Sequence, residues 1–172
     1  MAELVDAPGL GPGAERCRGS SPLSRTMKDF WTCLTYPLAP NEANRDAYKS
    51  LIVGSNVLLL GCTEILLPLV NDAVDLVRRY PDPKIRVGHW LEIEGYFDTV
   101  LADGSICLNK ELGQGIVNHF SKRCDRLIAR CFTKRHPQMR VATFFPSPND
   151  FEIIPKVVSE SEWYRFYLWD FV

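Results

Sequence analysis

Apolar residues fall into short continuous runs that are separated by glycine, proline and polar clusters. The clearest run covers residues 57–60, meets Gly61 and a polar turn, and is followed by a second apolar stretch at residues 65–70. A continuous apolar run bounded by turn signals is typical of a strand buried on both faces. We therefore expect a strand at 57–60 and a short helix from about Thr63 to Val70.

The same pattern continues along the chain. We expect further strands at about 73–76, 85–88, 97–102 and 126–132, and helices at about 42–52, with Asn41 as its cap, and 110–123. Strands that alternate with helices predict an α/β domain with a mostly parallel sheet and helices on both faces. Beyond Pro137 the pattern weakens. Residues 159–162 have capping-box spacing, so we expect a terminal helix there, and the C-terminal strands of the sheet stay undefined.

Composition limits the classes of function. The 172 residues carry a net charge of −1 and are 46% hydrophobic, which argues against a surface built as a whole for nucleic acid. The basic stretch at 122–140 is either a solvated face or, as the disfavoured alternative, a nucleic-acid patch. No apolar run reaches the roughly 18–20 residues of a membrane span.

Cysteine usage indicates reduced thiols and a cytoplasmic location. The six cysteines form no C-x-x-C pair, and only three histidines accompany them, so we expect no metal site. They lie at positions 17, 33, 62, 107, 124 and 131.

Residues 1–26 differ from the rest of the chain because they are rich in glycine, proline and serine and lack apolar periodicity. We expect disorder there. Residues 2–7 resemble a translation of the D-arm of a bacterial leucine tRNA gene, and residues 19–22 resemble its T-arm. We infer that the start codon was placed too early and that Met27 begins a single domain at 27–172. A genuine flexible tail is the alternative.

The turn from Gly61 to Glu64 is the first candidate site. Glycine allows a sharp turn and the close approach of a ligand, and ligands of open α/β sheets bind at the carboxyl ends of the strands. Cys62 or Thr63 would begin the following helix, whose free N–H groups favour an anionic group such as a carboxylate. The plainer interpretation is a buried strand and its turn.

Three further strand ends carry candidates. Asp75 ends the second strand and suits two ribose hydroxyls, or is a surface carboxylate. His89 and Trp90 follow the third strand, where a tryptophan either stacks on a flat ring or fills the core.

The expected fourth strand delivers Asp103 and Gly104 to the same sheet edge as Gly61. Asp103 is the candidate for contact with cofactor or substrate and for a catalytic role, with an Asp-Gly turn as the alternative. Asn109 and His119 are weaker candidates, since a base must reach the reacting atoms.

This order of strands, glycine turn and acids resembles the class I S-adenosylmethionine-dependent methyltransferases, which have a Rossmann-like fold. Residues 57–64 resemble the family's first motif, which holds the methionine part of the cofactor, and residues 97–105 are similar to a fourth strand found in some members. The family has several glycines in the first motif and often an acid at position 89, where this chain has one glycine and a histidine. The resemblance implies S-adenosylmethionine contacts at Gly61, Cys62, Thr63, Glu64, Asp75, His89, Trp90, Asp103 and Gly104.

The implied function is methyl transfer to an unknown, small-molecule acceptor. The alternative is a methyltransferase-like module that binds or interacts without catalysis, and a homodimer stays open. A dinucleotide enzyme is disfavoured, because the G-x-G-x-x-G spacing that cradles a pyrophosphate does not follow residues 57–60.

Overall fold

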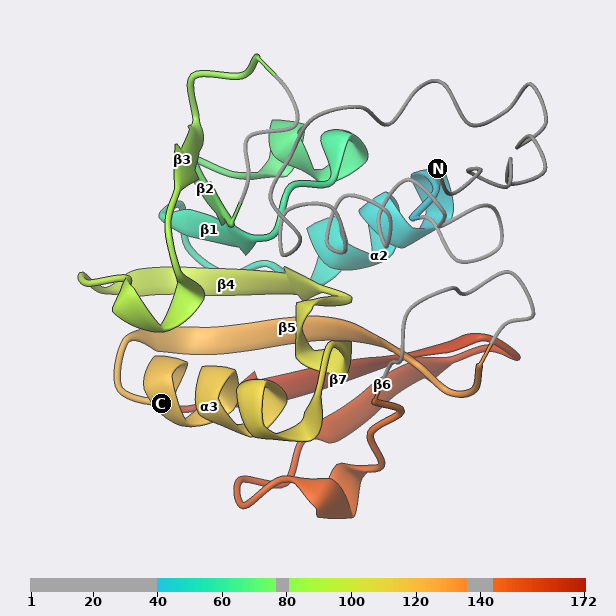
Figure 1. The fold of residues 1–172 in the computed structure, drawn as a ribbon. Helices are drawn as coiled ribbons and strands as arrows, with labels where there is room; N and C mark the ends of the chain where they lie inside the picture. The colour runs from blue at the N-terminus through green and yellow to red at the C-terminus, as the bar shows by residue number, and fades with distance from the viewer. Residues whose placement is uncertain (1–39, 77–80, 136–143) are drawn as a thin grey trace, which may run out of the picture.

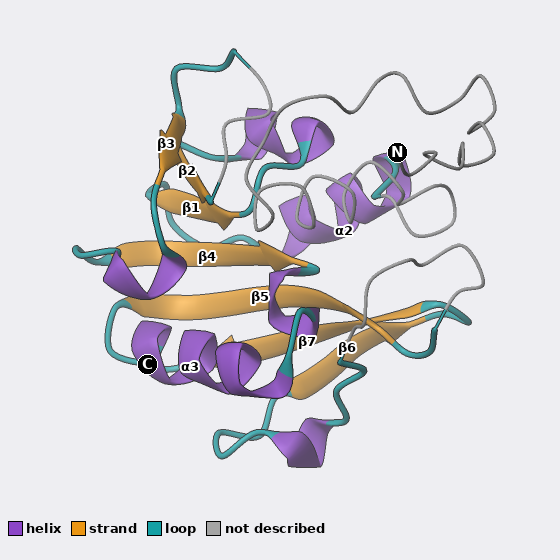
Figure 2. Ribbon diagram, viewed as in Figure 1, coloured by secondary structure: helices purple, strands orange, loops and turns teal. Residues whose placement is uncertain are grey.

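The computed structural model describes residues 40–76, 81–135 and 144–172. The expectations about residues 1–26 and the start at Met27 lie outside this part of the chain. The described residues form one twisted sheet with helices packed on both faces (Figures 1 and 2).

The sheet has seven strands in the order β3-β2-β1-β4-β5-β7-β6. The strands β1 to β5 run parallel, and β7 and β6 form an antiparallel hairpin beside β5. Their bounds are β1 Val57–Leu60, β2 Asp72–Asp75, β3 Ile85–Val87, β4 Phe97–Asp103, β5 Cys124–Phe132, β6 Lys156–Glu160 and β7 Tyr164–Asp170. The five expected strands are therefore confirmed within a few residues, and so is the mostly parallel α/β sheet.

Strand β1 is buried on both faces of the sheet. Its four residues are at most 3% exposed, and side chains of a strand alternate between the two faces. Leu58 and Leu60 pack into a core on one face, and Val57 and Leu59 pack into a separate core on the other face. A continuous apolar run is the sequence that such a strand requires.

Among the described residues, one α-helix covers each face of the sheet (Figure 1). Helix α3 (Lys110–Phe120) packs its apolar side onto the core of Leu58 and Leu60, and α2 (Glu42–Leu51) packs onto the opposite core. Asn41 caps α2 as expected: it accepts from the backbone N–H of Asn44, and Asn44 accepts from the N–H of Asn41 in return.

The expected helix at 63–70 is a 3₁₀ helix, η1 (Glu64–Leu69). Pro68 lies inside it and has no N–H to donate to the helical hydrogen-bond pattern. Thr63 precedes η1 but makes no side-chain cap. The expected element is present, but it is shorter and more tightly wound than an α-helix.

The expected terminal helix is wrong, because residues 156–170 form the hairpin of β6 and β7. The aromatic run alternates between the two faces of the sheet and is buried on both: Phe166 and Leu168 enter one core, while Tyr167 and Trp169 enter the other. Strand β7 pairs with β5 over seven positions. The hairpin therefore supplies the C-terminal strands and covers the edge of β5.

Candidate functional site

The candidate site lies where β1, β2 and β4 end. Strand β1 pairs with β2 on one side and with β4 on the other, so the order of the sheet reverses between β1 and β4. Such a switch point, at the carboxyl ends of parallel strands, is where ligands of open α/β sheets bind. The fold brings the expected turn at Gly61, the acid Asp75 and the acid Asp103 to this one edge.

The glycine turn after β1 folds toward β2. Gly61 has φ of 81°, which is the left-handed region that favours glycine, and its N–H donates to the carbonyl of Val74 at 2.8 Å. The N–H of Cys62 donates to Asp75 Oδ2 at 3.0 Å. The turn is therefore held by the strand beside it.

Asp75 is fully buried at the end of β2. Besides the bond from Cys62, its Oδ1 accepts from the N–H of Leu76 at 2.7 Å. Both donors are backbone groups, so the position of the carboxylate is fixed by the two chain segments that meet here.

Asp103, at the end of β4, is held differently. Arg130 lies directly opposite it on β5 and binds it in two places, with Nε 2.6 Å from Oδ1 and Nη2 3.2 Å from Oδ2. Both side chains are 0% exposed. Burial alone would lower the pKa of Arg130, but the Asp103 carboxylate outweighs burial and holds that pKa above its usual value.

Helix α2 completes this buried group. The Tyr48 hydroxyl donates to Asp103 Oδ1 at 3.1 Å and accepts from the backbone N–H of Arg130 at 3.0 Å. Asn44 Oδ1 accepts from Arg130 Nη1 at 3.3 Å. Burial, with the nearby carboxylate, raises the pKa of Tyr48 well above its usual range, so the phenol stays protonated and keeps donating.

Two buried hydroxyls at this edge have no hydrogen-bond partner among the described residues. They are Thr63 Oγ1, in the turn after β1, and Ser105 Oγ, which follows Asp103 and Gly104 after β4. Gly104 has φ of 73° and its N–H donates to the carbonyl of Arg130 at 3.1 Å. Buried polar groups are normally bonded, so these two are candidates for contact with a ligand.

His89 and Trp90, which follow β3, differ in their exposure to solvent. The side chain of His89 is exposed, and its Nδ1 accepts from the N–H of Leu91 at 3.2 Å. Trp90 is 1% exposed, and its ring nitrogen donates to the carbonyl of Val74 at 2.9 Å. The indole is a core residue in this structure and offers no open face for stacking.

Asn109 and His119 lie away from the edge. Asn109 caps α3 by accepting from the N–H of Leu112. His119, in the last turn of α3, makes a hydrogen bond of 2.9 Å between Nε2 and the carbonyl of Ile93, which precedes β4 and therefore lies toward its amino end. Neither side chain reaches the group around Asp103.

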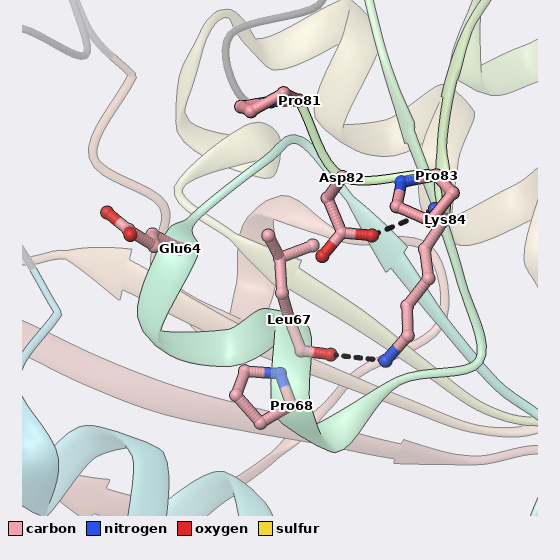
Figure 3. Close-up of a pocket in the computed structure, with 7 residues that line it drawn as sticks. All are labelled: Glu64, Leu67, Pro68, Pro81, Asp82, Pro83 and Lys84. Atoms are coloured by element: carbon pink, nitrogen blue, oxygen red, sulfur yellow. Dashed lines mark hydrogen bonds between the residues drawn. The ribbon is translucent and has the colours of Figure 1, made fainter.

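Glu64 lines a separate pocket of about 500 Å³ between η1 and the connection from β2 to β3 (Figure 3). Prolines 68, 81 and 83 form much of its wall. Lys84 donates to the carbonyl of Leu67 at 3.1 Å, and its backbone N–H donates to Asp82. The exposed carboxylate of Glu64 lies on this pocket, and neither Asp75 nor Asp103 lines it.

The helix dipole of η1 does not supply the expected anion site. Six residues of 3₁₀ helix give far fewer aligned peptide dipoles than an α-helix of ordinary length. The ligand-binding potential of the turn therefore rests on the Thr63 hydroxyl and the backbone rather than on a helix N-terminus.

The sequence did not predict Tyr48, Asn44 and Arg130 as parts of this edge. Tyr48 lies within the helix expected at 42–52, and Arg130 lies within the basic stretch at 122–140. The parallel pairing of β4 with β5 was the available signal, because it sets Asp103 opposite Arg130.

Other expectations concern charge and metal binding. Several basic residues of the 122–140 stretch are paired, since Arg126 binds Asp170 and Lys134 binds Glu162. Four free cysteine thiols are all buried, and no group of three or more metal-binding side chains occurs in the described part of the chain. Within residues 40–76, 81–135 and 144–172, no helix is long and apolar enough to cross a membrane.

Comparison with known proteins gives matches by structure only: no protein-family model matches the sequence, and no curated protein sequence matches it. Magnesium protoporphyrin IX methyltransferase (ChlM) from Synechocystis PCC 6803, with bound SAM, matches with a TM-score of 0.53 at 14% identity over 87% of this chain and 84% of that one. The same enzyme with bound SAH matches at 13% identity over 87% of both chains, also with a TM-score of 0.53.

The N-terminal domain of EvdMO1, with SAH bound, has a TM-score of 0.50 at 14% identity over 81% of this chain and 82% of that one. At identities of 13–14%, these matches concern the fold. The chain has the α/β fold of the class I S-adenosylmethionine-dependent methyltransferases.

Proposed function

We propose that this protein is an S-adenosylmethionine-dependent methyltransferase that acts on a small-molecule acceptor. The observation that carries the proposal is the glycine turn after β1, tied through the N–H of Cys62 to the acid that ends β2. This junction lies at the switch point of a methyltransferase fold. We take the small-molecule acceptor class from a structural neighbour that is named as a magnesium protoporphyrin IX methyltransferase.

The residues at this edge fit such a cofactor. In the proposal, Gly61 to Glu64 border its methionine part, Asp75 accepts from the ribose hydroxyls, and His89 lies on the adenine side. The unpartnered hydroxyl of Thr63 supports the fit, because a buried hydroxyl without a partner gains a hydrogen bond when a polar ligand arrives. When bound, the cofactor supplies a methyl group that is activated by its sulfonium.

Orientation is the catalytic contribution that we assign to this chain. A direct displacement needs the nucleophile and the methyl group held in line, which lowers the entropic part of the barrier. Asp103 serves this role as a positioning residue. Its ion pair with Arg130 and its bond from Tyr48 hold the end of β4 in place.

The second candidate function is a methyltransferase-like binding module without catalysis. The full burial of Asp75 in this structure favours it, since a carboxylate must be reached by the ribose that it binds. Turnover separates the two functions, whereas binding alone does not.

Titration calorimetry of the full chain with S-adenosylmethionine and S-adenosylhomocysteine tests the proposal. We expect dissociation constants on the order of micromolar, and a loss of about tenfold to a hundredfold in Asp75→Asn. Asp98→Asn is the matched control. That carboxylate also accepts two backbone N–H groups, from Ser55 and Asn56, but it lies near the amino end of β4.

A folded protein that binds neither ligand at millimolar concentration contradicts the proposal. Methyl-labelled S-adenosylmethionine, incubated with the protein and the small-molecule fraction of a cell extract, then separates an enzyme from an inactive module. The proposed enzyme produces a labelled small molecule, and Asp75→Asn produces less of it. Ligand binding without any labelled product supports the module.

A further inference from the structure

A pocket lies between η1 and the connection from β2 to β3, and neither Asp75 nor Asp103 lines it (Figure 3). Asp75 ends β2 and Ile85 begins β3, so nine residues join the two strands. A crossover between parallel strands usually takes about a dozen residues or more and contains an α-helix. Residues 81–84, the last four of this connection, form no helix. The short crossover leaves a hollow of about 500 Å³ beside η1.

Hydrogen bonds of Lys84 fix the two walls of this pocket relative to each other. Its Nζ donates to the carbonyl of Leu67 at 3.1 Å and to that of Val70 at 2.9 Å, at the end of η1. On the opposite wall, Asp82 Oδ1 accepts from the N–H of Lys84 at 2.9 Å, and the Asp82 carbonyl accepts from the N–H of Ile85 at 3.1 Å. A ligand would meet walls that are already formed, so little conformational entropy would be lost when it binds.

Proline rings make the walls apolar and rigid. Pro68 comes from η1, and Pro81 and Pro83 come from the opposite wall (Figure 3). A proline side chain loses no rotamer entropy when a ligand covers it. The volume of about 500 Å³ lies within the roughly 300–1,000 Å³ of small-molecule sites. Such walls suit a flat apolar body, such as an aromatic ring.

The charged side chains of the pocket leave a negative balance. Among the described residues that line it, Lys84 is the only cation, and two backbone carbonyls already accept from its ammonium group. Asp82 and Glu64 are the acids, and in the part of the chain that the structure describes neither carboxylate has an ion-pair partner. Two carboxylates therefore favour a cation, whose hydrogen bonds to them are stronger than those between neutral groups.

We propose that this pocket binds a protonated aromatic amine, with the ring against the prolines and the ammonium group beside the carboxylates of Asp82 and Glu64. Three features together define this ligand class: rigid apolar walls, a volume in the small-molecule range and two acids without a paired cation. The site lies apart from the switch point of the sheet and does not depend on the proposed function. Glu64 is the residue that it shares with the proposed cofactor site, so the test centres on Asp82.

The test compares tryptamine with indole-3-propionate, because the two molecules share an indole ring and carry opposite charges. Titration of the full chain, followed by the NMR signals of backbone amides, should give a dissociation constant below about one millimolar for tryptamine. The amide signals of Leu67 and Lys84 should shift. Indole-3-propionate should bind at least about tenfold more weakly, and added salt should weaken the binding of tryptamine.

Asp82→Asn removes one charge and keeps an oxygen that can accept from the N–H of Lys84. It should weaken tryptamine about fivefold to tenfold and leave the affinity for S-adenosylhomocysteine unchanged. Asp46→Asn is the matched control, because Asp46 is exposed on α2 and does not line the pocket. This control should change the affinity for tryptamine by less than about twofold.

Three results would overturn the inference. One is a folded wild-type protein that binds no tryptamine at about ten millimolar, and another is equal affinity for tryptamine and indole-3-propionate. The third is an Asp82→Asn variant that weakens S-adenosylhomocysteine as much as tryptamine, because the pocket would then belong to the cofactor site. A protein that binds tryptamine as described and does not bind S-adenosylhomocysteine contradicts the proposed function and supports this inference.

Discussion

Two buried aspartates at strand ends of this protein accept hydrogen bonds from different kinds of donor. Asp75, at the end of β2, accepts from the backbone N–H groups of Cys62 and Leu76, which are 13 residues and one residue away in the sequence. Asp103, at the end of β4, accepts from the side chains of Arg130 and Tyr48, which are 27 and 55 residues away. Both carboxylates are buried at one sheet edge.

In the proposed function, this difference separates a ligand side from a scaffold side. The backbone N–H groups of Cys62 and Leu76 orient the Asp75 carboxylate, which we propose as the acceptor for polar groups of a ligand. A buried guanidinium cancels the charge of Asp103 and fastens three elements, β4, β5 and α2, into one unit. In this proposal, aspartates at equivalent positions of the sheet have different roles, ligand binding at Asp75 and structural support at Asp103.

The largest expected effect is on the scaffold side. Arg130→Met should cost about 3–5 kcal/mol of unfolding free energy, because it leaves the Asp103 carboxylate buried without its cation. Denaturant unfolding followed by circular dichroism measures this cost. Asp75→Asn should cost less, because the amide oxygen of asparagine can still accept from the backbone N–H groups of Cys62 and Leu76.

Arg86→Met is the matched control, because Arg86 also pairs with an aspartate, Asp72, but is exposed. It should change stability by no more than about 1 kcal/mol. If Arg130→Met and Arg86→Met lowered the unfolding free energy equally, the ion pair of Asp103 and Arg130 would have no special role in stability.

The next largest effect concerns the tyrosine that joins α2 to the edge. Tyr48→Phe keeps the aromatic contact with Phe166, whose ring centroid lies 5.0 Å away, and removes the hydroxyl that bridges Asp103 and Arg130. We expect a loss of about 1–3 kcal/mol in thermal or denaturant unfolding.

Tyr96→Phe controls for the loss of a tyrosine hydroxyl, because that hydroxyl donates to Asp125 at an exposed position. Its stability should stay within about 0.5 kcal/mol of the wild type. A Tyr48→Phe variant as stable as Tyr96→Phe would mean that α2 is held by apolar packing alone.

The smallest effect comes from Asp98, a third carboxylate, which accepts from backbone donors but is only partly buried. The N–H groups of Asn56 and Ser55 hold the pKa of Asp98 below its usual value. Because the folded pKa is lowered, this stabilisation is present above the unfolded pKa near 4 and is lost as the pH falls toward the folded pKa. The melting temperature of Asp98→Asn should therefore fall less than that of the wild type between about pH 5 and pH 3. Parallel curves for the two proteins would contradict this assignment.

The sequence predicted the parallel part of the fold because its signals are local. The apolar run at 57–60, the glycine after it and the Asn41 cap each act within a few residues, and each is confirmed in the structure. The hairpin of β6 and β7 was mistaken for a helix. Its aromatic run is buried on both faces, so the alternation of the two faces is hidden in the sequence, and a capping-box spacing favoured the wrong element.

Only those residues of the site that local sequence patterns indicate were predicted. Gly61, Asp75 and Asp103 follow strands directly, so their gathering at one edge follows from parallel pairing. The partners of Asp103 depend on the register between β4 and β5 and on the packing of α2, which no local pattern specifies. Trp90 shows the same limit, because whether an indole stacks on a ligand or fills the core depends on what lies above it.

A crystal structure of the full chain with S-adenosylhomocysteine tests the central claim most directly. We predict the ligand across the ends of β1, β2 and β4, with its ribose hydroxyls on Asp75. Ligand bound in the pocket lined by Glu64 and Lys84, or no bound ligand in crystals grown at saturating concentration, would contradict it.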